Sequence, residues 1–228
     1  MKKIVVLTGA GVSAESGLKT FRDSNGLWRT YRFEEVASPN AWHRDPELVL
    51  EFYNIRRKQL LEVEPNAAHY ALVKLEEKYD VQVVTQNVDD LHERAGSKNI
   101  LHIHGELRKS RSTADDSLIY DIDGWELKWG DKCEKGSQLR PHVVWFGEPV
   151  DMIGQAAQIT RSADVVIVIG TSLAVYPAAG LIYDVAASVP KFYIDPNAGH
   201  ISGISNLTPV PKKAAEEVPK LVDQLLAK

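Results

Sequence analysis

The sequence predicts an α/β protein built on a parallel sheet, with a smaller lobe inserted into that sheet. Short apolar runs rich in valine and isoleucine alternate with segments of helical periodicity, as in parallel strands joined by crossover helices. The runs are apolar throughout, which indicates strands buried on both faces. Expected strands are 3–8, 81–85, 99–102, 142–146, 164–170 and 191–194, and expected helices are 46–63, 67–78, 151–161, 177–187 and 214–226.

Two segments interrupt the alternation. Residues 30–64 form a long excursion after the first strand, and residues 108–140 are polar, acidic and without a clear helical period. We expect a small lobe made of about 30–79 and 108–140, and a large lobe made of about 1–29, 80–107 and 141–228. A cleft between lobe and sheet is the expected ligand site.

Composition narrows the class of protein. A chain of 228 residues with 44% hydrophobic and 25% charged residues can bury a sizeable core as an ordinary globular protein. The net charge of −4 argues against a basic surface for nucleic acid, and the strand-sized apolar runs argue against a membrane span. Cys133 is the only cysteine, which excludes an internal disulfide and favours a reducing, cytoplasmic compartment.

The first expected strand leads into a turn of small residues at 9–11. Small residues let the backbone approach a phosphate closely, so we expect a nucleotide-phosphate cradle. The spacing matches the dinucleotide fingerprint only in part, because Ala14 stands where a third glycine is usual. A tight strand-to-helix turn without a ligand is the alternative. The cradle residues are Gly9, Ala10 and Gly11.

Polar side chains follow the expected strand 81–85. Gln86, Asn87 and Asp89 stand just past its carboxyl end, where open α/β sheets place ligands. Amide side chains can hold a carboxamide or ribose hydroxyls, and a carboxylate can accept from an amide N–H. The alternative is a helix N-cap at Asn87 or Asp89 that serves no ligand.

Two histidines alternate with apolar residues at the end of the expected strand 99–102. His102 and His104 therefore share one face, and His104 lies at the edge beside Gly105. A histidine at such an edge can act as a general base near neutral pH. A structural histidine is one alternative, and a metal-binding pair is another, although no third ligand is evident nearby.

Six motifs in order, GAGVSAESG, FRD, TQNVDDLH, HIHGEL, RPHVVWFGE and GTSLAVYPAAG, resemble the sirtuin family of NAD-dependent protein deacylases. The resemblance covers essentially the whole chain. It implies a single catalytic domain, 1–228, with a Rossmann-type sheet, helices on both of its faces and a small inserted lobe. It also implies NAD-dependent removal of acyl groups from protein lysine side chains, with release of nicotinamide and O-acyl-ADP-ribose.

The resemblance implies roles for individual residues. His104 matches the general base that takes a proton from a ribose hydroxyl. The residues expected at the NAD site are Gly9, Ala10, Gly11, Phe21, Arg22, Gln86, Asn87, Asp89, Gly170, Thr171, Ser172, Asp195, Asn197 and Ala214. The residues expected to clamp the substrate peptide are Val144, Phe146, Gly147, Glu148, Val175 and Tyr176.

The chain departs from the family at the zinc site. Most sirtuins hold the small lobe with zinc on four cysteines, but here Ser112 and Asp115 fall where the first pair would be, and Lys135 or Gly136 stands near Cys133. A four-cysteine site is therefore excluded, and we expect no structural zinc. The residues expected to hold the lobe by packing are Leu118, Ile119, Tyr120, Ile122, Trp125, Leu127 and Trp129.

A Tyr-x-x-Arg pattern indicates the acyl group. Tyr53 and Arg56 are three residues apart on an expected helix and share a face. A guanidinium beside a phenol can bind a carboxylate, and the pattern matches the sirtuin subclass that removes malonyl and succinyl groups. Ala37 matches a small residue that leaves room for the longer acyl chain. The alternative is a surface arginine beside a half-buried tyrosine.

These observations favour a desuccinylase or demalonylase that also deacetylates. The alternatives are an ADP-ribosyltransferase or NAD hydrolase, which needs His104 but not Tyr53 and Arg56, and a non-catalytic NAD or ADP-ribose sensor. The expected partners are acylated-lysine proteins or peptides. We expect no nucleic-acid binding, no membrane association and a monomer.

Overall fold

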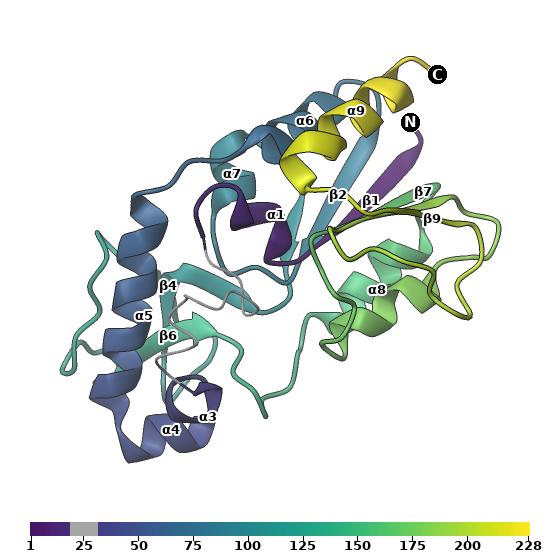
Figure 1. Ribbon diagram of the computed structural model, residues 1–228. Coiled ribbons are helices and arrows are strands. Elements are labelled where there is room, and N and C mark those ends of the chain that lie inside the picture. Colours follow the sequence, from purple (N-terminus) through teal and green to yellow (C-terminus); the bar gives the residue numbers. More distant parts are fainter. Residues whose placement is uncertain (19–31) are drawn as a thin grey trace.

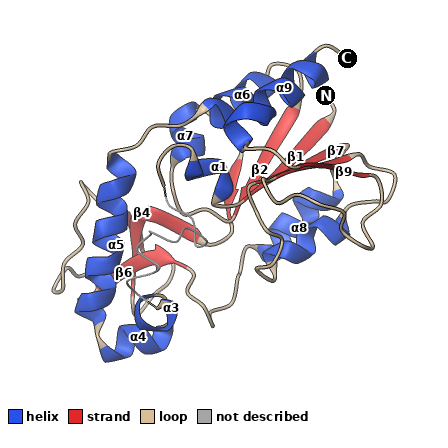
Figure 2. Ribbon diagram, viewed as in Figure 1, coloured by secondary structure: helices blue, strands red, loops and turns tan. Residues whose placement is uncertain are grey.

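The computed structural model describes residues 1–18 and 32–228. Its centre is a six-stranded sheet in the order β3-β2-β1-β7-β8-β9, in which all neighbouring strands are parallel. Helices cover both faces, with α6 and α9 on one and α8 on the other (Figures 1 and 2). The strands are β1 (Lys3–Thr8), β2 (Asp80–Thr85), β3 (Ile100–His102), β7 (Val165–Ile169), β8 (Lys191–Ile194) and β9 (Leu207–Val210). The helices are α6 (Ala67–Leu75), α8 (Ile153–Arg161) and α9 (Ala214–Leu226), with a 3₁₀ helix, η1 (Ala178–Asp184).

Strand β1 shows why the sequence has apolar runs rather than alternation. Ile4 and Val6 pack into the core cluster that contains residues of α6 and α9. Val5 and Leu7 pack into the opposite cluster, with residues of α8 and η1. Because β1 also pairs with a strand on each side, its residues from Ile4 to Thr8 are buried on both faces and both edges.

A smaller lobe lies beside the large sheet (Figure 1). Its antiparallel sheet has the order β5-β4-β6, and α5 packs against both β4 and β6. The strands are β4 (Gly105–Ser112), β5 (Ile119–Asp121) and β6 (Leu139–Val143). The helices are α3 (Phe33–Val36), α4 (Pro39–Arg44) and α5 (Pro46–Leu61), while the short α1 (Gly11–Ala14) and α7 (Leu91–Ala95) follow β1 and β2.

Local capping starts three of these helices. The Ser38 hydroxyl accepts from the N–H of Ala41 at the start of α4, and the Asp45 carboxylate accepts from Leu48 at the start of α5. Proline occupies the first position of both helices, where its missing N–H costs nothing. Asn66 caps α6 in the same way.

The predicted fold class is confirmed, and the bounds of β1, β8 and α9 agree with the expected ones. Two expectations are wrong in detail. The expected strand 142–146 lies earlier, because β6 (Leu139–Val143) follows its antiparallel register with β4. The expected helix 177–187 is the shorter 3₁₀ helix η1. The polar segment 108–140 supplies the end of β4, all of β5 and the start of β6, and connecting turns make up the rest of it.

The division into two lobes remains a prediction, and one segment packs differently from it. Residues 67–78 were expected in the small lobe, but α6 packs against α9 in the core of the large sheet. The reason is that Ala68, Leu72 and Leu75 form an apolar face that β1 and α9 bury. Along the described ranges, no helix combines the length and apolarity needed to cross a bilayer.

Apolar packing accounts for only part of the small lobe's cohesion. Ile122 and Leu127 are buried against Leu50 of α5, as the packing prediction requires. Trp125 and Trp129 are 39% and 55% exposed, so these two expected packing residues lie at the surface of the lobe, where the Trp129 ring centroid is 6.3 Å from that of Trp42. The apolar cluster here is therefore small.

Polar side chains of α5 provide further cohesion. The buried Arg57 donates to the carbonyls of Leu107 and Trp125, each at 2.7 Å. Asn54 accepts from the N–H of Leu127 at 2.9 Å and donates to its carbonyl at 3.0 Å. These bonds fix the segment after β5 to α5, because side chains satisfy backbone groups that no strand partner reaches.

At the outer end of the lobe lies a polar clip, which we define as Ser112, Asp115, Cys133 and Lys135. The Cys133 thiol donates to the Ser112 hydroxyl at 3.3 Å, and Lys135 Nζ lies 2.6 Å from the Asp115 carboxylate. The same hydroxyl accepts from the N–H of Asp115. This donor set does not fit a four-cysteine zinc site, since one member is a cation already paired with the carboxylate.

Candidate functional site

A cleft of about 700 Å³ lies where the carboxyl ends of β1 and β7 meet. From these adjacent strands the sheet extends in opposite directions, through β2 on one side and β8 on the other, so the cleft lies at a topological switch point. Its volume is in the range of cofactor pockets. The predicted site residues that line it are Gly9, Ala10, Gly11, Gln86, Asn87, His104, Val144, Phe146, Gly147, Glu148, Gly170, Thr171, Ser172, Val175, Tyr176, Asp195, Asn197 and Ala214.

The glycines of the cradle allow two loops to approach each other. A Cβ on Gly9 would lie 2.8 Å from the carbonyl oxygen of Gly170, and one on Gly11 would lie 2.6 Å from the Gly170 Cα. The N–H of Gly11 donates to that same carbonyl at 2.8 Å. Because Gly9 and Gly11 have no side chains, the cradle packs directly against the loop after β7, and the two loops together form the floor of the cleft.

The loop after β2 contributes two amide side chains to the cleft. Gln86 donates to the Thr171 hydroxyl at 3.2 Å, which spans the cleft floor from β2 to β7. Asn87 donates to the carbonyl of Gly9 at 3.1 Å, and its N–H donates to the Thr85 hydroxyl at 3.0 Å. Both side chains are thus held in place against the cradle.

Asp89 lies behind this loop and is 7% exposed. Its carboxylate accepts from the Ser13 hydroxyl at 3.0 Å and from the N–H of Leu91 at 3.2 Å, the first residue of α7. Burial raises its pKa to about 6, although both hydrogen bonds act in the opposite direction. Asp89 therefore does cap the start of α7 in part, as the helix N-cap alternative expected. A buried carboxylate with a raised pKa close to the cradle is also typical of functional sites.

His104 lines the cleft, and a hydrogen bond to the backbone carbonyl of Gln86 orients its ring. Its Nδ1 lies 3.1 Å from the carbonyl oxygen of Gln86, so this nitrogen carries a proton and donates. Burial lowers the pKa of the ring, which keeps it neutral at pH 7. The other nitrogen, Nε2, is then the proton acceptor that a general base requires.

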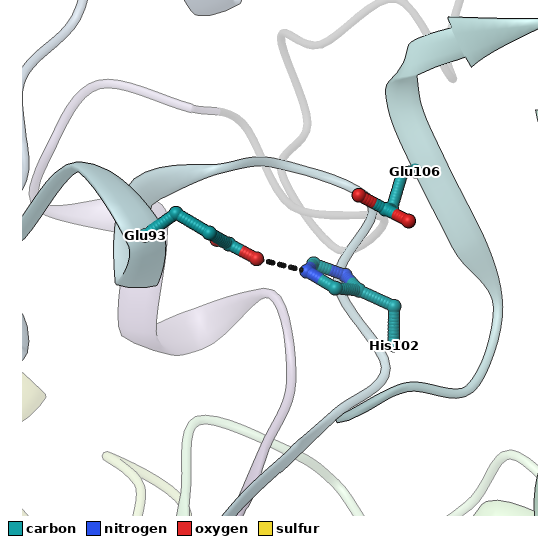
Figure 3. A group of neighbouring side chains, drawn as sticks. All are labelled: Glu93, His102 and Glu106. Carbon is teal, nitrogen blue, oxygen red and sulfur yellow. Dashed lines mark hydrogen bonds and ion pairs between the residues drawn. The ribbon is translucent and has the colours of Figure 1, made fainter. Parts of the chain in front are cut away.

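His102 does not line the cleft; its side chain lies in a polar cluster with Glu93 and Glu106 (Figure 3). Its Nδ1 donates to the carbonyl of Asn87 at 2.8 Å, and its Nε2 lies 2.6 Å from Glu93. The structure supplies the third metal-type ligand that the sequence did not show, because Glu106 brings the three ligand atoms within 4.8 Å of one another. Since Glu106 also pairs with Lys109 at 3.0 Å, we interpret the cluster as a hydrogen-bonded network.

One wall of the cleft follows β6. The N–H of Val144 donates to the carbonyl of His104 at 2.9 Å, which joins the wall to the candidate base. Across the cleft lie Val175 and Tyr176, which are 43% and 70% exposed. The opening is therefore lined by accessible apolar groups.

The Glu148 side chain forms hydrogen bonds that hold the same wall together. Its carboxylate accepts two hydrogen bonds from Arg140, at 2.6 and 3.0 Å, and a third from the N–H of Trp145 at 2.8 Å. Arg140 also stacks over the Trp145 ring, 3.2 Å from its centroid. Burial acts to raise the pKa of Glu148, but these bonds outweigh it and lower the pKa. Sequence reasoning missed Arg140, because only the folded turn brings the two charges together.

The three residues of the expected acyl receptor lie beside this wall but do not line the described cleft. Tyr53 and Ala37 belong to the same core cluster as Trp145, which does line the cleft. The Arg56 guanidinium lies 5.6 Å from the centroid of the Tyr53 ring. Burial lowers the pKa of Arg56, while Tyr53 and Asp89 act to raise it, so the receptor is within electrostatic reach of Asp89.

Other lining residues were not predicted. Glu15 accepts from the N–H of Ala215 at 2.7 Å and so ties α1 to the start of α9. Trp145 lies within a motif that the sequence did single out, whereas Lys213 gave no separate signal. The predicted residues Phe21 and Arg22 lie outside the described residues. The additional lining residues are Ala14, Glu15, Trp145, Val150, Pro177, Pro196 and Lys213.

Comparisons with known proteins agree with this geometry. A model of the Sir2 family matches residues 9–177. An NAD-dependent protein deacylase of Helicobacter pylori is 49% identical over 228 residues, spanning 99% of this chain and 98% of that protein. A Sir2 homologue solved with ADP-ribose has a TM-score of 0.91 at 42% identity, covering 99% of this chain and 92% of that one. A Sir2 homologue–NAD complex has a TM-score of 0.89 at 43% identity, covering 99% of this chain and 90% of that one.

Proposed function

The chain belongs to the Sir2 family and is an NAD-dependent protein deacylase, and we propose that it removes succinyl and malonyl groups from lysine as well as acetyl. One observation carries the choice of acyl group. Tyr53 and Arg56 lie together beside the cleft wall, and Ala37 packs in the same cluster. A cation with a phenol at this place can receive a terminal carboxylate.

The cleft fits NAD in size and in polar groups. Its volume of about 700 Å³ suits a dinucleotide, and the switch point at the carboxyl ends of the adjacent strands β1 and β7 is where such folds bind one. When bound, NAD supplies an ADP-ribosyl group with nicotinamide as its leaving group. We assign the nicotinamide end to Gln86 and Asn87 and the adenosine end to Asp195 and Asn197, which line opposite parts of the site.

His104 supplies the base. Its Nδ1 proton is committed to the Gln86 carbonyl, so Nε2 accepts a proton from a hydroxyl held in the cleft. The lowered pKa keeps this nitrogen unprotonated at neutral pH. Trp145, Phe146 and Val175 provide apolar walls that exclude water from the reacting groups.

The receptor is suited to an acidic acyl chain. Burial raises the pKa of Tyr53, so its hydroxyl remains protonated and able to donate. Arg56 can donate two parallel hydrogen bonds to a carboxylate, which an acetyl group lacks. A succinyl group therefore gains an interaction at this place that an acetyl group cannot make.

We would test this with matched acetyl-lysine and succinyl-lysine peptides, followed by mass spectrometry with and without NAD. Arg56→Met should lower kcat/KM for the succinyl peptide by about 10- to 100-fold, the range for a charge-assisted hydrogen bond, and change the acetyl value by less than about threefold. The matched control is Arg161→Met, because Arg161 pairs with Asp184 on the surface, away from the cleft. His104→Ala should abolish both reactions and retain ADP-ribose binding.

The other outcomes distinguish the alternatives. NAD consumption without loss of either acyl group would favour an ADP-ribosyltransferase or NAD hydrolase. Binding without turnover would favour a sensor. Equal losses for both peptides in Arg56→Met would reject the carboxylate receptor while leaving deacetylation intact as a function. The cytoplasmic location and the monomeric state remain predictions.

A further inference from the structure

Two histidines hold two consecutive carbonyls of the cofactor loop. His104 donates to the carbonyl of Gln86 at 3.1 Å, and His102 donates to the carbonyl of Asn87 at 2.8 Å. His104 faces the cleft, whereas the His102 side chain is 9% exposed and points to Glu93 on α7 (Figure 3). The proposed reaction uses His104 and leaves His102 without a role.

The partners of His102 determine its protonation. A carbonyl oxygen can only accept, so Nδ1 must carry a proton. The Glu93 carboxylate at 2.6 Å from Nε2 also accepts, so this nitrogen carries a proton too. Burial acts to lower the pKa of His102, but the hydrogen bond and charge of Glu93 outweigh it and raise the pKa. His102 therefore keeps its second proton to a higher pH in the folded protein than an unperturbed histidine does.

Several charged or titratable groups surround His102. Glu93 of α7 and Glu106 of β4 favour the imidazolium, and Lys109 offsets part of their charge. His102 in turn lowers the pKa of the neighbouring His92 and acts to lower that of Asp89. The His102 charge thus stabilises the ionised Asp89 behind the cofactor loop.

We propose that His102 and Glu93 form a positioning pair that fixes Asn87 in the geometry needed to bind the nicotinamide end of NAD. The Asn87 side chain lines the cleft and donates to the Gly9 carbonyl, while its own carbonyl is held by His102. The residue is therefore held from both ends, between the cradle and α7. This inference rests on the proposed function, because that function assigns nicotinamide to this end of the cleft.

Loss of one proton from His102 would break its hydrogen bond to the Asn87 carbonyl. With Glu93 ionised, neutral His102 keeps its remaining proton on Nε2, because a carboxylate is a stronger acceptor than a carbonyl. Nδ1 then presents a lone pair to the Asn87 carbonyl and repels it. The positioning pair should therefore operate below the raised pKa of His102 and fail above it.

Three variants separate positioning from a general structural role. His102→Ala removes the donor and should raise KM for NAD, and the nicotinamide concentration for half inhibition, by about tenfold, as for one lost hydrogen bond. His102→Asn should restore both values to within about threefold of wild type, because the Asn Nδ2 stands where the imidazole Nδ1 was and can donate to the same carbonyl. Glu93→Gln should retain the wild-type KM and remove the alkaline rise, because neutral His102 can then donate from Nδ1 and accept from the amide.

The measurements are KM for NAD from about pH 6 to about pH 9, with an acetyl peptide so that the acyl receptor is not involved. His43→Ala is the matched control, since the exposed His43 also bonds a backbone carbonyl, that of Pro39 at 2.7 Å, but does not line the cleft. Thermal unfolding of each variant establishes that it is folded.

Any of three results would overturn the inference. The first is a wild-type KM in His102→Ala at every pH. The second is a His102→Asn variant as impaired as His102→Ala, and the third is an alkaline rise unchanged in Glu93→Gln. Should the wild-type protein show no deacylation, the proposed function fails, and calorimetric binding of NAD and nicotinamide to the same variants still tests the positioning pair.

Discussion

The Asp89 carboxylate behind the cofactor cleft and the Asp115 carboxylate of the polar clip are both hydrogen-bonded, but they differ in burial. Around the cleft, Asp89 and Asn87 are each 7% exposed, and burial raises the Asp89 pKa to about 6. In the clip, Lys135 and Asp115 pair at the surface, and their hydrogen bonds lower the Asp115 pKa to about 2. Burying the Asp89 carboxylate costs free energy, whereas solvent reaches the Lys135–Asp115 pair. The other two clip residues, Ser112 and Cys133, are buried and bonded to each other.

This difference predicts that substitutions at the Lys135–Asp115 pair are tolerated better than substitutions around the cleft. A surface ion pair contributes little to stability, and α5 holds the lobe independently of that pair through Arg57. The buried groups of the cleft are each tied to a backbone atom of the cradle or of α7. Changing one of them leaves a buried partner unsatisfied.

The largest effect is expected from the cleft wall. Arg140→Leu should lower the free energy of unfolding by about 2–4 kcal/mol, because it leaves the Glu148 carboxylate in a largely buried wall with the N–H of Trp145 and, as its charged partner, only the weaker contact to Arg111. Urea denaturation would measure it. We expect Arg161→Leu, which breaks an exposed pair, to cost no more than roughly 1 kcal/mol. Equal losses in the two variants would remove the distinction between the buried and exposed regions.

An intermediate effect is expected at Asp89. Its folded pKa of about 6 lies above its ordinary value of 3.8, so the stability it contributes is present below about pH 4 and is lost as the pH rises through 6. The side chain of Asp89→Asn does not ionise. The free energy of unfolding of this variant, taken relative to that of wild type, should therefore rise by about 1–3 kcal/mol from pH 4 to pH 8. The variant should also bind NAD more weakly. If Asp89→Asn differs in stability from wild type by the same amount at pH 4 and at pH 8, then burial does not raise the pKa of Asp89.

The smallest effect is expected in the clip. Lys135→Met removes the ion pair with Asp115 but leaves the Cys133–Ser112 hydrogen bond and the contacts of α5 in place. Its unfolding midpoint in physiological salt should equal that of wild type, because solvent screens the exposed charges. Calorimetry would measure the midpoint. A large decrease, with loss of deacylation, would show that the clip is essential to the lobe and contradict the comparison.

Much of the cleft was predictable because its residues follow strand ends. Parallel strands place their carboxyl ends at one edge, so the segments after β1, β2 and β7 had to meet. The expected positions of Gly9, Gln86, His104 and Thr171 at one cleft rest on this regularity. The acyl receptor was a different kind of prediction, since helix periodicity puts Tyr53 and Arg56 on one face but does not say what that face meets.

The small sheet could not be located in this way. Residues 105–112 alternate weakly, and 119–121 are too short for periodicity to show. Their pairing depends on register with β6 and on the bonds from Arg57 and Asn54, which lie more than 45 residues away in sequence. Long-range hydrogen bonds of this kind leave no local pattern.

By itself, the sequence determined the parallel sheet, its apolar strands and the polar residues at their ends, because burial on two faces and chain direction impose those patterns locally. Only the tertiary structure decided what those residues do to one another. It commits Glu148 to Arg140, places α6 with the large sheet, and turns His102 toward Glu93 while His104 faces the cleft. Such choices depend on burial and on partners distant in sequence, and these exist only after the chain has folded.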